Sequence, residues 1–269
     1  MAEGAEIYTH GHAESVLRSH RWRTVDNSAA YLRHRLEPGT NVLDIGCGPA
    51  SITVDMARRV APARVVGLDA AEDAIAAARD AAKAAGVPNL EVETGDVYAL
   101  HHADDTFDVV HAHQVLQHLA DPVAALREMR RVCRPGGVVA VRDAVYRGMS
   151  WFPASPGLDH WLRVYCAVAE ANGGEPDAGS RLRAWARQAG FSDVQTSASA
   201  WCYATDDERA WWGGLWAERV EATAFGTRAV ELGLASEADV TEMADGWRAW
   251  AAAPDGWFAV LHGEVLAAP

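Results

Sequence analysis

The segment NVLDIGCGPAS, residues 41–51, constrains the fold of this chain more than any other stretch. A short apolar strand stops there at two closely spaced glycines, and an acid stands just before them. In an open parallel sheet the first strand-to-helix turn lies nearest to a bound ligand, and a glycine lets that ligand approach the main chain where a Cβ would collide. We therefore expect Gly46 and Gly48 to line a ligand site. Asp44 is interpreted as an acid that organises the turn, faces a cation or accepts hydrogen bonds from loop amides.

Short apolar runs alternate with helical patterns from this segment onward. Strands are predicted over 42–46, 64–69, 90–96, 107–113 and 138–143, and helices over 51–60, 72–86 and 121–137. Gly86 is expected to end the second helix, and Asp121 with Pro122 to begin the third. This alternation is typical of an α/β fold with a doubly wound, mostly parallel sheet.

Tryptophan marks the second half of the chain, where ten of the eleven tryptophans lie between residues 151 and 257. Helices are predicted over 158–174, 177–191 and about 206–252, and strands over 191–204 and 257–268. We expect one Rossmann-like domain with seven strands, in which residues 37–146 form the ligand-binding core. Residues 147–269 complete this domain, with tryptophan-rich helical inserts after the fifth strand (about 151–175) and between the last two strands (206–252).

Composition and charge narrow the class of partner. A net charge of −13 disfavours nucleic acid, whose phosphate backbone is bound by clustered lysine and arginine. No window approaches 18 uninterrupted apolar residues, and the first residues lack the basic flank and apolar stretch of a secretory signal. The four cysteines form no CxxC pair, which predicts reduced thiols. We expect a cytoplasmic protein that acts on a small molecule, without a membrane partner; exposed tryptophans are compatible with a homodimer face as well as with a pocket.

Asp69 closes the second predicted strand, 23 residues after Gly46. A carboxylate at that place accepts hydrogen bonds from both hydroxyls of a ribose, which implies an adenosine-containing ligand. Gly-x-Gly alone is equally compatible with a nicotinamide dinucleotide. However, the run from Gly46 to Ser51 lacks the third glycine of the dinucleotide fingerprint, and an acid two residues before the first glycine is not part of that fingerprint.

Five motifs follow one another along the chain: LDIGCGPAS, Asp69 in VVGLDA, Gly95-Asp96 in ETGDVYAL, FDVVHAHQVLQHLADP, and RPGG at 134–137. In this order and spacing they resemble the class I S-adenosylmethionine-dependent methyltransferases, particularly the group named after ubiquinone and menaquinone biosynthesis. The resemblance covers residues 41–145. The chain departs from the family at Ala50, where glycine is usual, and we expect the methyl group there only to tighten helix packing.

The resemblance implies a role for each matching residue. The methionine part of S-adenosylmethionine would lie over Gly46 and Gly48, with Asp44 near its ammonium, and Asp69 would hold the ribose. The other implied cofactor residues are Cys47 in the same turn, Ala70 after the ribose acid, Asp96 at the adenine amino group with the Val97 amide beside it, and His113 and Gln114 next to the sulfonium.

The front segment, residues 1–36, is predicted to be a helical lid. Its stretch YTHGHAESVLRSHRWRTVDNSAAYL looks like the opening of a methyltransferase subgroup from bacteria and fungi. Such a lid would close over the methionine end of the cofactor, with Tyr8 or Arg23 near the carboxylate. A helix over 25–36 is expected to pack beside the first strand.

Methyl transfer from a sulfonium is an in-line displacement, so catalysis rests mainly on positioning and on exclusion of water. The candidates for an apolar acceptor pocket are Trp151, Trp161, Trp211, Trp212 and Trp216. A hydroxyl or phenol acceptor would need a base, and the candidates are His113, His118, His10 and Asp143. An amine, a thiolate or an electron-rich carbon needs little or no base, so the methylated atom stays open among O, N and C.

Metal is not expected in this chemistry. His10 and His12 offer two imidazoles, but no nearby Asp, Glu or Cys completes a set of ligands. Two alternatives to a methyltransferase remain: a nicotinamide-dependent oxidoreductase, and a regulatory protein that binds S-adenosylmethionine without turnover.

Overall fold

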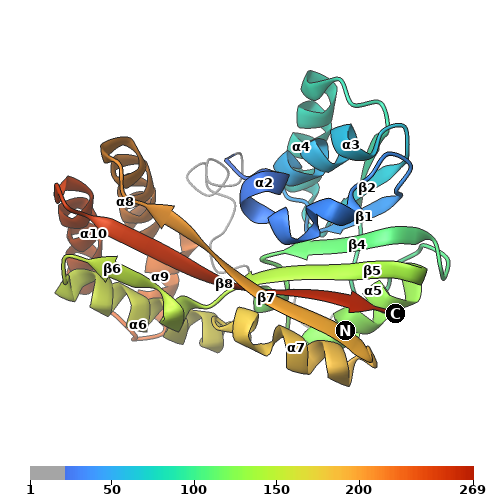
Figure 1. Cartoon of the computed structure of the whole chain (residues 1–269). Helices are drawn as coiled ribbons and strands as arrows, with labels where there is room; N and C mark the ends of the chain where they lie inside the picture. Colours follow the sequence, from blue (N-terminus) through green and yellow to red (C-terminus); the bar gives the residue numbers. More distant parts are fainter. Residues whose placement is uncertain (1–21) are drawn as a thin grey trace.

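The computed structural model describes residues 22–269, whose strands form one mixed sheet (Figure 1). The strands are β1 (Val42–Ile45), β2 (Val65–Asp69), β3 (Leu90–Thr94), β4 (Phe107–His113), β5 (Cys133–Ala144), β6 (Ser150–Phe152), β7 (Asp193–Tyr203) and β8 (Trp257–Ala268). Their order is β3-β2-β1-β4-β5-β8-β6, with β7 paired to β8. The doubly wound, mostly parallel sheet is therefore confirmed. The described part has eight strands rather than seven, because a three-residue β6 pairs with β8 at the start of the segment expected to be a helical insert.

The strand order reverses beside β1, and this reversal decides where a ligand can bind. From β1 the chain proceeds to β2 and β3 on one side, then crosses to β4 and β5 on the other. All four neighbouring pairs among β1–β5 are parallel, so their carboxyl ends meet at one edge of the sheet. Helices that leave β1 and β4 toward different faces open a crevice at this edge.

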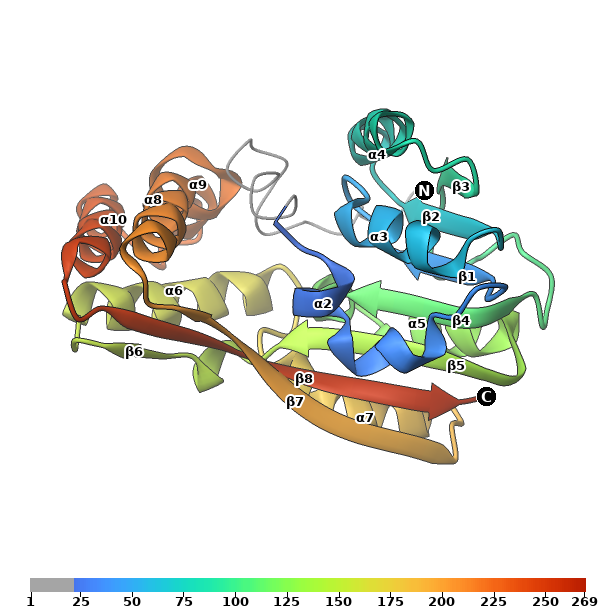
Figure 2. The same ribbon diagram turned by 45° about the horizontal axis from the view of Figure 1, so that its top comes forward.

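Helices cover both faces of the parallel part (Figure 2). The helices of one face are α2 (Val25–Ser28), the 3-10 helix η1 (Ala30–Arg35), α3 (Ser51–Val60) and α4 (Glu72–Ala85), and those of the other are α5 (Pro122–Val132) and α7 (Ala178–Gln188). The Asp121 carboxylate caps α5 by accepting from the Ala124 amide, Pro122 opens that helix, and left-handed Gly86 ends α4, as expected. The predicted end of the third helix at residue 137 is wrong, because α5 ends at Val132 and β5 already begins at Cys133. β1 is buried on both sides, which explains its uninterrupted apolar sequence.

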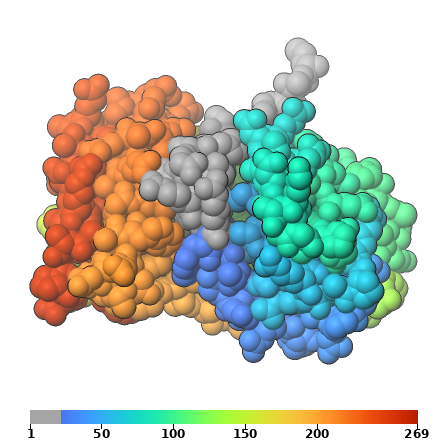
Figure 3. Space-filling model, turned by 90° about the horizontal axis from the view of Figure 1, so that it is seen from above, coloured from blue at the N-terminus to red at the C-terminus, as the bar shows by residue number. Residues whose placement is uncertain are grey.

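Four further helices form a cap at one end of the sheet: α6 (Pro156–Ala171), α8 (Asp206–Ala222), α9 (Ala224–Glu231) and α10 (Glu237–Ala252). Seen from above, α8–α10 in orange and red lie at the opposite end from the blue-to-green strands and helices (Figure 3). An aromatic core holds the cap together: the Trp161 ring centroid lies 4.6 Å from that of Trp216 and 4.8 Å from that of Trp247. Within residues 22–269, no helix combines the length and apolar character needed to cross a membrane.

The antiparallel pair of β7 and β8 connects the cap to the parallel part of the sheet. The carboxyl half of β8 pairs with β5, whereas its first residues pair with β6 and pack in the cap core. β7 follows β8 over its whole length. The last residues of β7, among them Trp201 and Tyr203, are therefore carried to the junction between sheet and cap.

Two helical segments contain breaks in the structure, and the first of them differs from the expected single helix. The segment 25–36 is not one helix, because the backbone leaves helical geometry at Ala29 (φ −137°) between α2 and η1. This break exposes the Asn27 carbonyl, which accepts a 2.6 Å hydrogen bond from the Trp201 indole. The segment 206–252 is divided into α8, α9 and α10, and the first break places Thr223 as an N-cap of α9.

Ala50 occupies a left-handed backbone position (φ 61°) as the N-cap of α3. The expectation that its methyl group only tightens packing is therefore incomplete. The side chain is fully buried, but an L-residue in this conformation costs on the order of 1 kcal/mol relative to glycine. This cost is the physical reason why glycine is the favoured residue at such a position.

Candidate active site

A cavity of about 1080 Å³ lies along the carboxyl edge of the sheet. One part, which we call the polar lobe, is lined by the turn 46–48 after β1 and by Asp44, Asp69 and Asp96 at the tips of three strands. The other part, the aromatic lobe, is lined mainly by Trp201, Tyr203, Trp211, Trp212 and Trp216 from β7 and α8. Both lobes belong to one continuous cavity. This arrangement brings together residues that are up to 238 positions apart, from Trp22 to Val260.

The turn after β1 has positive φ at Gly46 (65°) and at Gly48 (54°). A Cβ at Gly46 would overlap the side chain of Val115, which follows β4. Glycine is thus required at position 46 by the backbone conformation and by a contact within the chain, in addition to any ligand. Cys47 lies between the two glycines on the cavity wall, and burial, reinforced by the nearby Asp44, raises the pKa of its thiol.

Asp69 connects the tips of β1 and β2. Its Oδ2 accepts from the Gly48 amide at 2.9 Å, and its Oδ1 accepts from the Ala71 amide at 3.0 Å. Each carboxylate oxygen has a further lone pair, and the side chain lines the cavity with Ala70 beside it. The carboxylate is therefore held in place with capacity to accept two hydroxyl donors.

Asp44 is more deeply buried than the sequence indicated. Its Oδ1 lies 2.7 Å from His111 Nδ1, and its Oδ2 accepts from the Thr53 hydroxyl at 2.5 Å. The alternative of an acid that bonds loop amides is not what these contacts show. His111 is fully buried, and it orients the Asp44 carboxylate at the floor of the polar lobe.

Asp96 and Val97 follow β3 at the outer rim of the polar lobe. The Asp96 side chain is exposed, and its Oδ1 accepts from the Tyr98 amide at 2.8 Å, which closes a local turn. The Tyr98 hydroxyl in turn accepts from the Asp121 amide at 3.1 Å, tying this rim to the start of α5. Val97 is buried under the turn.

Gln114 lies between the two lobes with positive φ (55°). Its Oε1 accepts from Arg23 Nη2 at 2.7 Å, and its Nε2 lies 3.0 Å from His262 Nε2. The Arg23 guanidinium also lies 5.5 Å from the Trp201 ring centroid, in cation–π geometry. Arg23 therefore reaches the cavity. Tyr8 and His10, the other predicted lid residues, lie outside the described residues.

His113 stands at the boundary of the two lobes, at the end of β4. Its ring centroid lies 5.7 Å from that of Trp201 and 6.3 Å from that of His262. Within residues 22–269 neither ring nitrogen has a hydrogen-bond partner. Burial, and then the charges of Arg23 and Arg142, lower the pKa of His113 well below its ordinary value, so the imidazole is neutral at pH 7. A neutral, buried ring with one donor and one acceptor in the cavity is suited to bind a hydroxyl group.

His118 also lines the cavity, and it belongs to the short 3-10 helix η2 (Leu116–His118). Its Nε2 lies 3.1 Å from Gln117 Nε2. Burial and the charge of Arg23 lower the pKa of His118 to about 4. His118 is therefore a second neutral imidazole in the lining of this cavity.

Asp143 was a candidate base, but the structure does not bring it into the cavity lining. It is fully buried at the end of β5, where its Oδ1 accepts from the Gln117 amide at 3.1 Å and so holds η2 against the sheet. Burial raises the pKa of Asp143 to about 7. This carboxyl supports the turn that carries His118.

The replacement Asp143→Asn is expected to change how stability depends on pH. The pKa of Asp143 in the folded protein, about 7, lies above the ordinary value near 3.9, so the folded state binds more protons than the unfolded state between these values. The free energy of unfolding of the wild type should therefore fall as the pH rises through this window, by up to about 4 kcal/mol, whereas the variant lacks this loss. Urea unfolding at pH 5 and pH 8 measures the difference. If the difference in free energy of unfolding between variant and wild type is the same at pH 5 and pH 8, this assignment is wrong.

The predicted tryptophans divide into two groups. Trp211, Trp212 and Trp216 line the cavity, whereas Trp151 and Trp161 do not. Trp161 is fully buried in the cap core, and Trp151 stacks on Phe258.

Several lining residues were not predicted from the sequence: Trp22, Tyr146, Trp201 and Tyr203. Trp201 and Tyr203 alternate along β7, so they share one face of that strand. This alternation was visible in the sequence. That the face meets the cavity depends on the long β7–β8 pairing.

Comparisons with known proteins agree with this geometry. A family model described as a methyltransferase domain matches residues 36–190. An uncharacterized methyltransferase of Schizosaccharomyces pombe is 30% identical over 267 residues, which cover 96% of this chain and 95% of the relative. A demethylmenaquinone methyltransferase of Listeria welshimeri is 34% identical over 134 residues, or 49% of this chain and 53% of the relative, in line with the group named from the motifs. One similar solved structure is a phosphoethanolamine N-methyltransferase of Haemonchus contortus in complex with phosphomonomethylethanolamine and S-adenosylhomocysteine. The match has a TM-score of 0.55 at 18% identity and covers 89% of this chain and 52% of that chain, so the two proteins share the fold.

Proposed function

Because this chain belongs to the class I S-adenosylmethionine-dependent methyltransferases, we propose that it binds S-adenosylmethionine in the polar lobe and methylates a small aromatic or otherwise apolar molecule held in the aromatic lobe. One observation carries this proposal: a single cavity joins the strand-tip carboxylates to a wall of aromatic rings. A dinucleotide would need polar partners for its second half, whereas the corresponding part of this cavity is aromatic. The oxidoreductase alternative has no support from the family match.

The polar lobe offers complementary groups for each part of the cofactor. The fixed Asp69 carboxylate would accept from the ribose hydroxyls, and Asp96 with the Val97 amide would bind the adenine edge. The turn 46–48 would lie under the methionine part, with Asp44 beneath its ammonium and Arg23 near its carboxylate. Opposite charges thus meet both ends of the amino acid moiety.

The bound cofactor supplies an activated methyl group, so the protein mainly has to position the acceptor and exclude water. The aromatic lobe does both, because its rings present flat apolar surfaces on which a planar acceptor stacks. His113 lies where this lobe meets the polar lobe, and its neutral imidazole can take the proton of an acceptor hydroxyl as the methyl group arrives. His118 is close enough along the wall to bind a second polar group.

The replacement Trp211→Leu tests the acceptor site. Trp211 is half-buried and lines the cavity, so its loss should remove a stacking surface for the acceptor without unfolding the cap. We expect the KM for a phenolic acceptor to rise about tenfold, since aromatic contacts contribute on the order of 1 kcal/mol, while the Kd for S-adenosylmethionine stays unchanged. The matched control is Trp185→Leu. Trp185 is a half-buried tryptophan of α7 that packs against the core between this helix and the sheet. Equal effects of both replacements on KM would contradict an aromatic acceptor lobe.

The replacement His113→Phe tests the base. Phenylalanine keeps a flat ring between Trp201 and His262 but has no ring nitrogen. We expect the rate of S-adenosylhomocysteine formation with a panel of phenols and catechols to fall about 100-fold or more. The Kd for S-adenosylmethionine should change little, and the exposed His34→Phe should behave as wild type. Full turnover by the variant would remove His113 as a base. No product from the wild type with any acceptor would favour the regulatory alternative.

A further inference from the structure

We propose that Glu93, His101 and His102 form a binding site for one divalent transition-metal cation of borderline softness, best matched by Zn²⁺, at the β3 edge of the sheet. None of the three residues lines the cavity described above. Glu93 lies on β3, an edge strand, and the two histidines lie on the loop that leads from the cavity rim to β4. The site is therefore separate from the methyl-transfer chemistry, for which no metal is expected.

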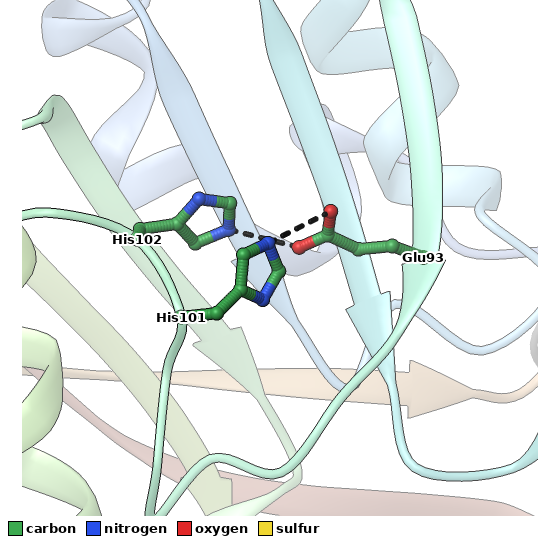
Figure 4. Close-up of side chains that lie close together, drawn as sticks. All are labelled: Glu93, His101 and His102. Carbon is green, nitrogen blue, oxygen red and sulfur yellow. Dashed lines mark hydrogen bonds and ion pairs between the residues drawn. The ribbon is translucent and has the colours of Figure 1, made fainter.

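The three side chains point toward one another (Figure 4). Glu93 Oε1 lies 2.8 Å from His102 Nε2, and Glu93 Oε2 lies 3.5 Å from His101 Nε2. Each of the three residues offers one ligand atom, and these three atoms all lie within 4.8 Å of one another. Ligands about 2.0–2.1 Å from a tetrahedral Zn²⁺ are about 3.3 Å apart, so a shift of a few tenths of an ångström suffices for the two carboxylate–imidazole pairs. Two imidazoles and a carboxylate are a donor set that Zn²⁺ favours.

His102 is the best-prepared ligand. It is buried, its ring packs edge-on against Phe107 at 5.0 Å between centroids, and its backbone carbonyl accepts from Arg131 Nη1 at 2.8 Å. A metal at Nε2 would leave the ring proton on Nδ1.

The surroundings leave the cation accessible and partly balance its charge. The His101 side chain is 63% exposed, so water can complete the coordination sphere on that side. The positively charged side chain of Arg64 lies nearby, and its Nη2 is paired with Glu91 Oε2 at 2.7 Å. Glu93 therefore remains as the carboxylate that directly faces the two imidazoles.

A cation here would join both ends of the segment 93–102. This segment passes through Asp96 and Val97 at the rim of the polar lobe, and its two ends meet at Glu93 and the histidine pair. Metal binding would thus fix the rim segment against the edge strand. Because such a cation binds the folded state, it should also raise the Tm of the protein.

The test is calorimetric titration of the full, tag-free chain with ZnCl₂ in the absence of S-adenosylmethionine. We expect the wild type to bind one more Zn²⁺ than Glu93→Gln or His101→Ala, or to bind it at least tenfold more tightly. Glu93→Gln keeps a hydrogen-bonding side chain and His101 is exposed, so both variants should fold, as their Tm without metal will show. A Zn²⁺-dependent increase in Tm of a few degrees should be present in the wild type and absent from both variants.

Two controls separate this site from other histidines. His160→Ala removes a ligand of a second group, with Asp239 and Glu242, and should leave the Zn²⁺ bound at Glu93 unchanged. The double variant His10→Ala, His12→Ala removes the histidines of the front segment and should do the same. The proposal is overturned if the wild type shows no saturable Zn²⁺ binding, or if binding survives Glu93→Gln and His101→Ala but is lost in either control.

Discussion

Asp69→Asn will weaken S-adenosylmethionine binding by about 10²- to 10⁴-fold. The carboxylate accepts from the Gly48 and Ala71 amides, and we propose that its remaining lone pairs accept from the two ribose hydroxyls. Hydrogen bonds to a charged group contribute about 1.5–3 kcal/mol each, so loss of two accounts for this range. In addition, the new amide group would direct a donor at one of the backbone amides. Calorimetric titration with S-adenosylmethionine measures the effect.

The matched control is Asp80→Asn, which removes the same charge from an exposed position of α4. It should bind the cofactor as the wild type does. Thermal unfolding of the Asp69 variant shows how much of its loss comes from the turn itself. An Asp69→Asn protein that is stable and binds S-adenosylmethionine with wild-type affinity would disprove the placement of the ribose.

Gly46→Ala will lower the free energy of unfolding by about 3 kcal/mol. The φ of 65° costs an L-residue about 1–2 kcal/mol, and overlap of the new Cβ with the Val115 side chain adds a similar amount. For a chain of this size the expected decrease in Tm is roughly 6–12 °C. Urea or thermal unfolding measures the change.

A second replacement distinguishes the two causes. Val115→Ala removes the overlapping methyl group but leaves the backbone strain, so Gly46→Ala combined with Val115→Ala should be more stable than the sum of the single changes by about 1–2 kcal/mol. Strictly additive changes would mean that the contact between the turn and Val115 does not limit position 46. In that case only the backbone conformation, or the ligand, would require glycine there.

Much of the polar lobe was predictable because its residues lie at fixed places relative to their own strands. Asp44, Gly46, Asp69 and Asp96 each stand at or just beyond a strand end, and parallel strands bring such positions to one edge. The local signals that end helices, at Gly86 and Asp121, were predictable for the same reason.

Other features depended on contacts between distant segments. Nothing near Asp143 in the sequence indicates that it packs under η2 rather than in the cavity. The break at Ala29 becomes intelligible only with the Trp201 indole bound to the neighbouring carbonyl. Burial of Asp44 between His111 and Thr53 likewise requires three elements to meet.

The sequence by itself determined the order of strands and helices, the glycine turn and the family, because these follow from periodicity and from motifs a few residues long. The tertiary structure decided which tryptophans face the cavity and which fill the cap core. Trp161 and Trp216 have similar helical surroundings in the sequence, yet only Trp216 reaches the cavity. Trp161 is enclosed in the cap core against Trp216 and Trp247, and such packing is the sum of many weak long-range contacts that no local pattern encodes.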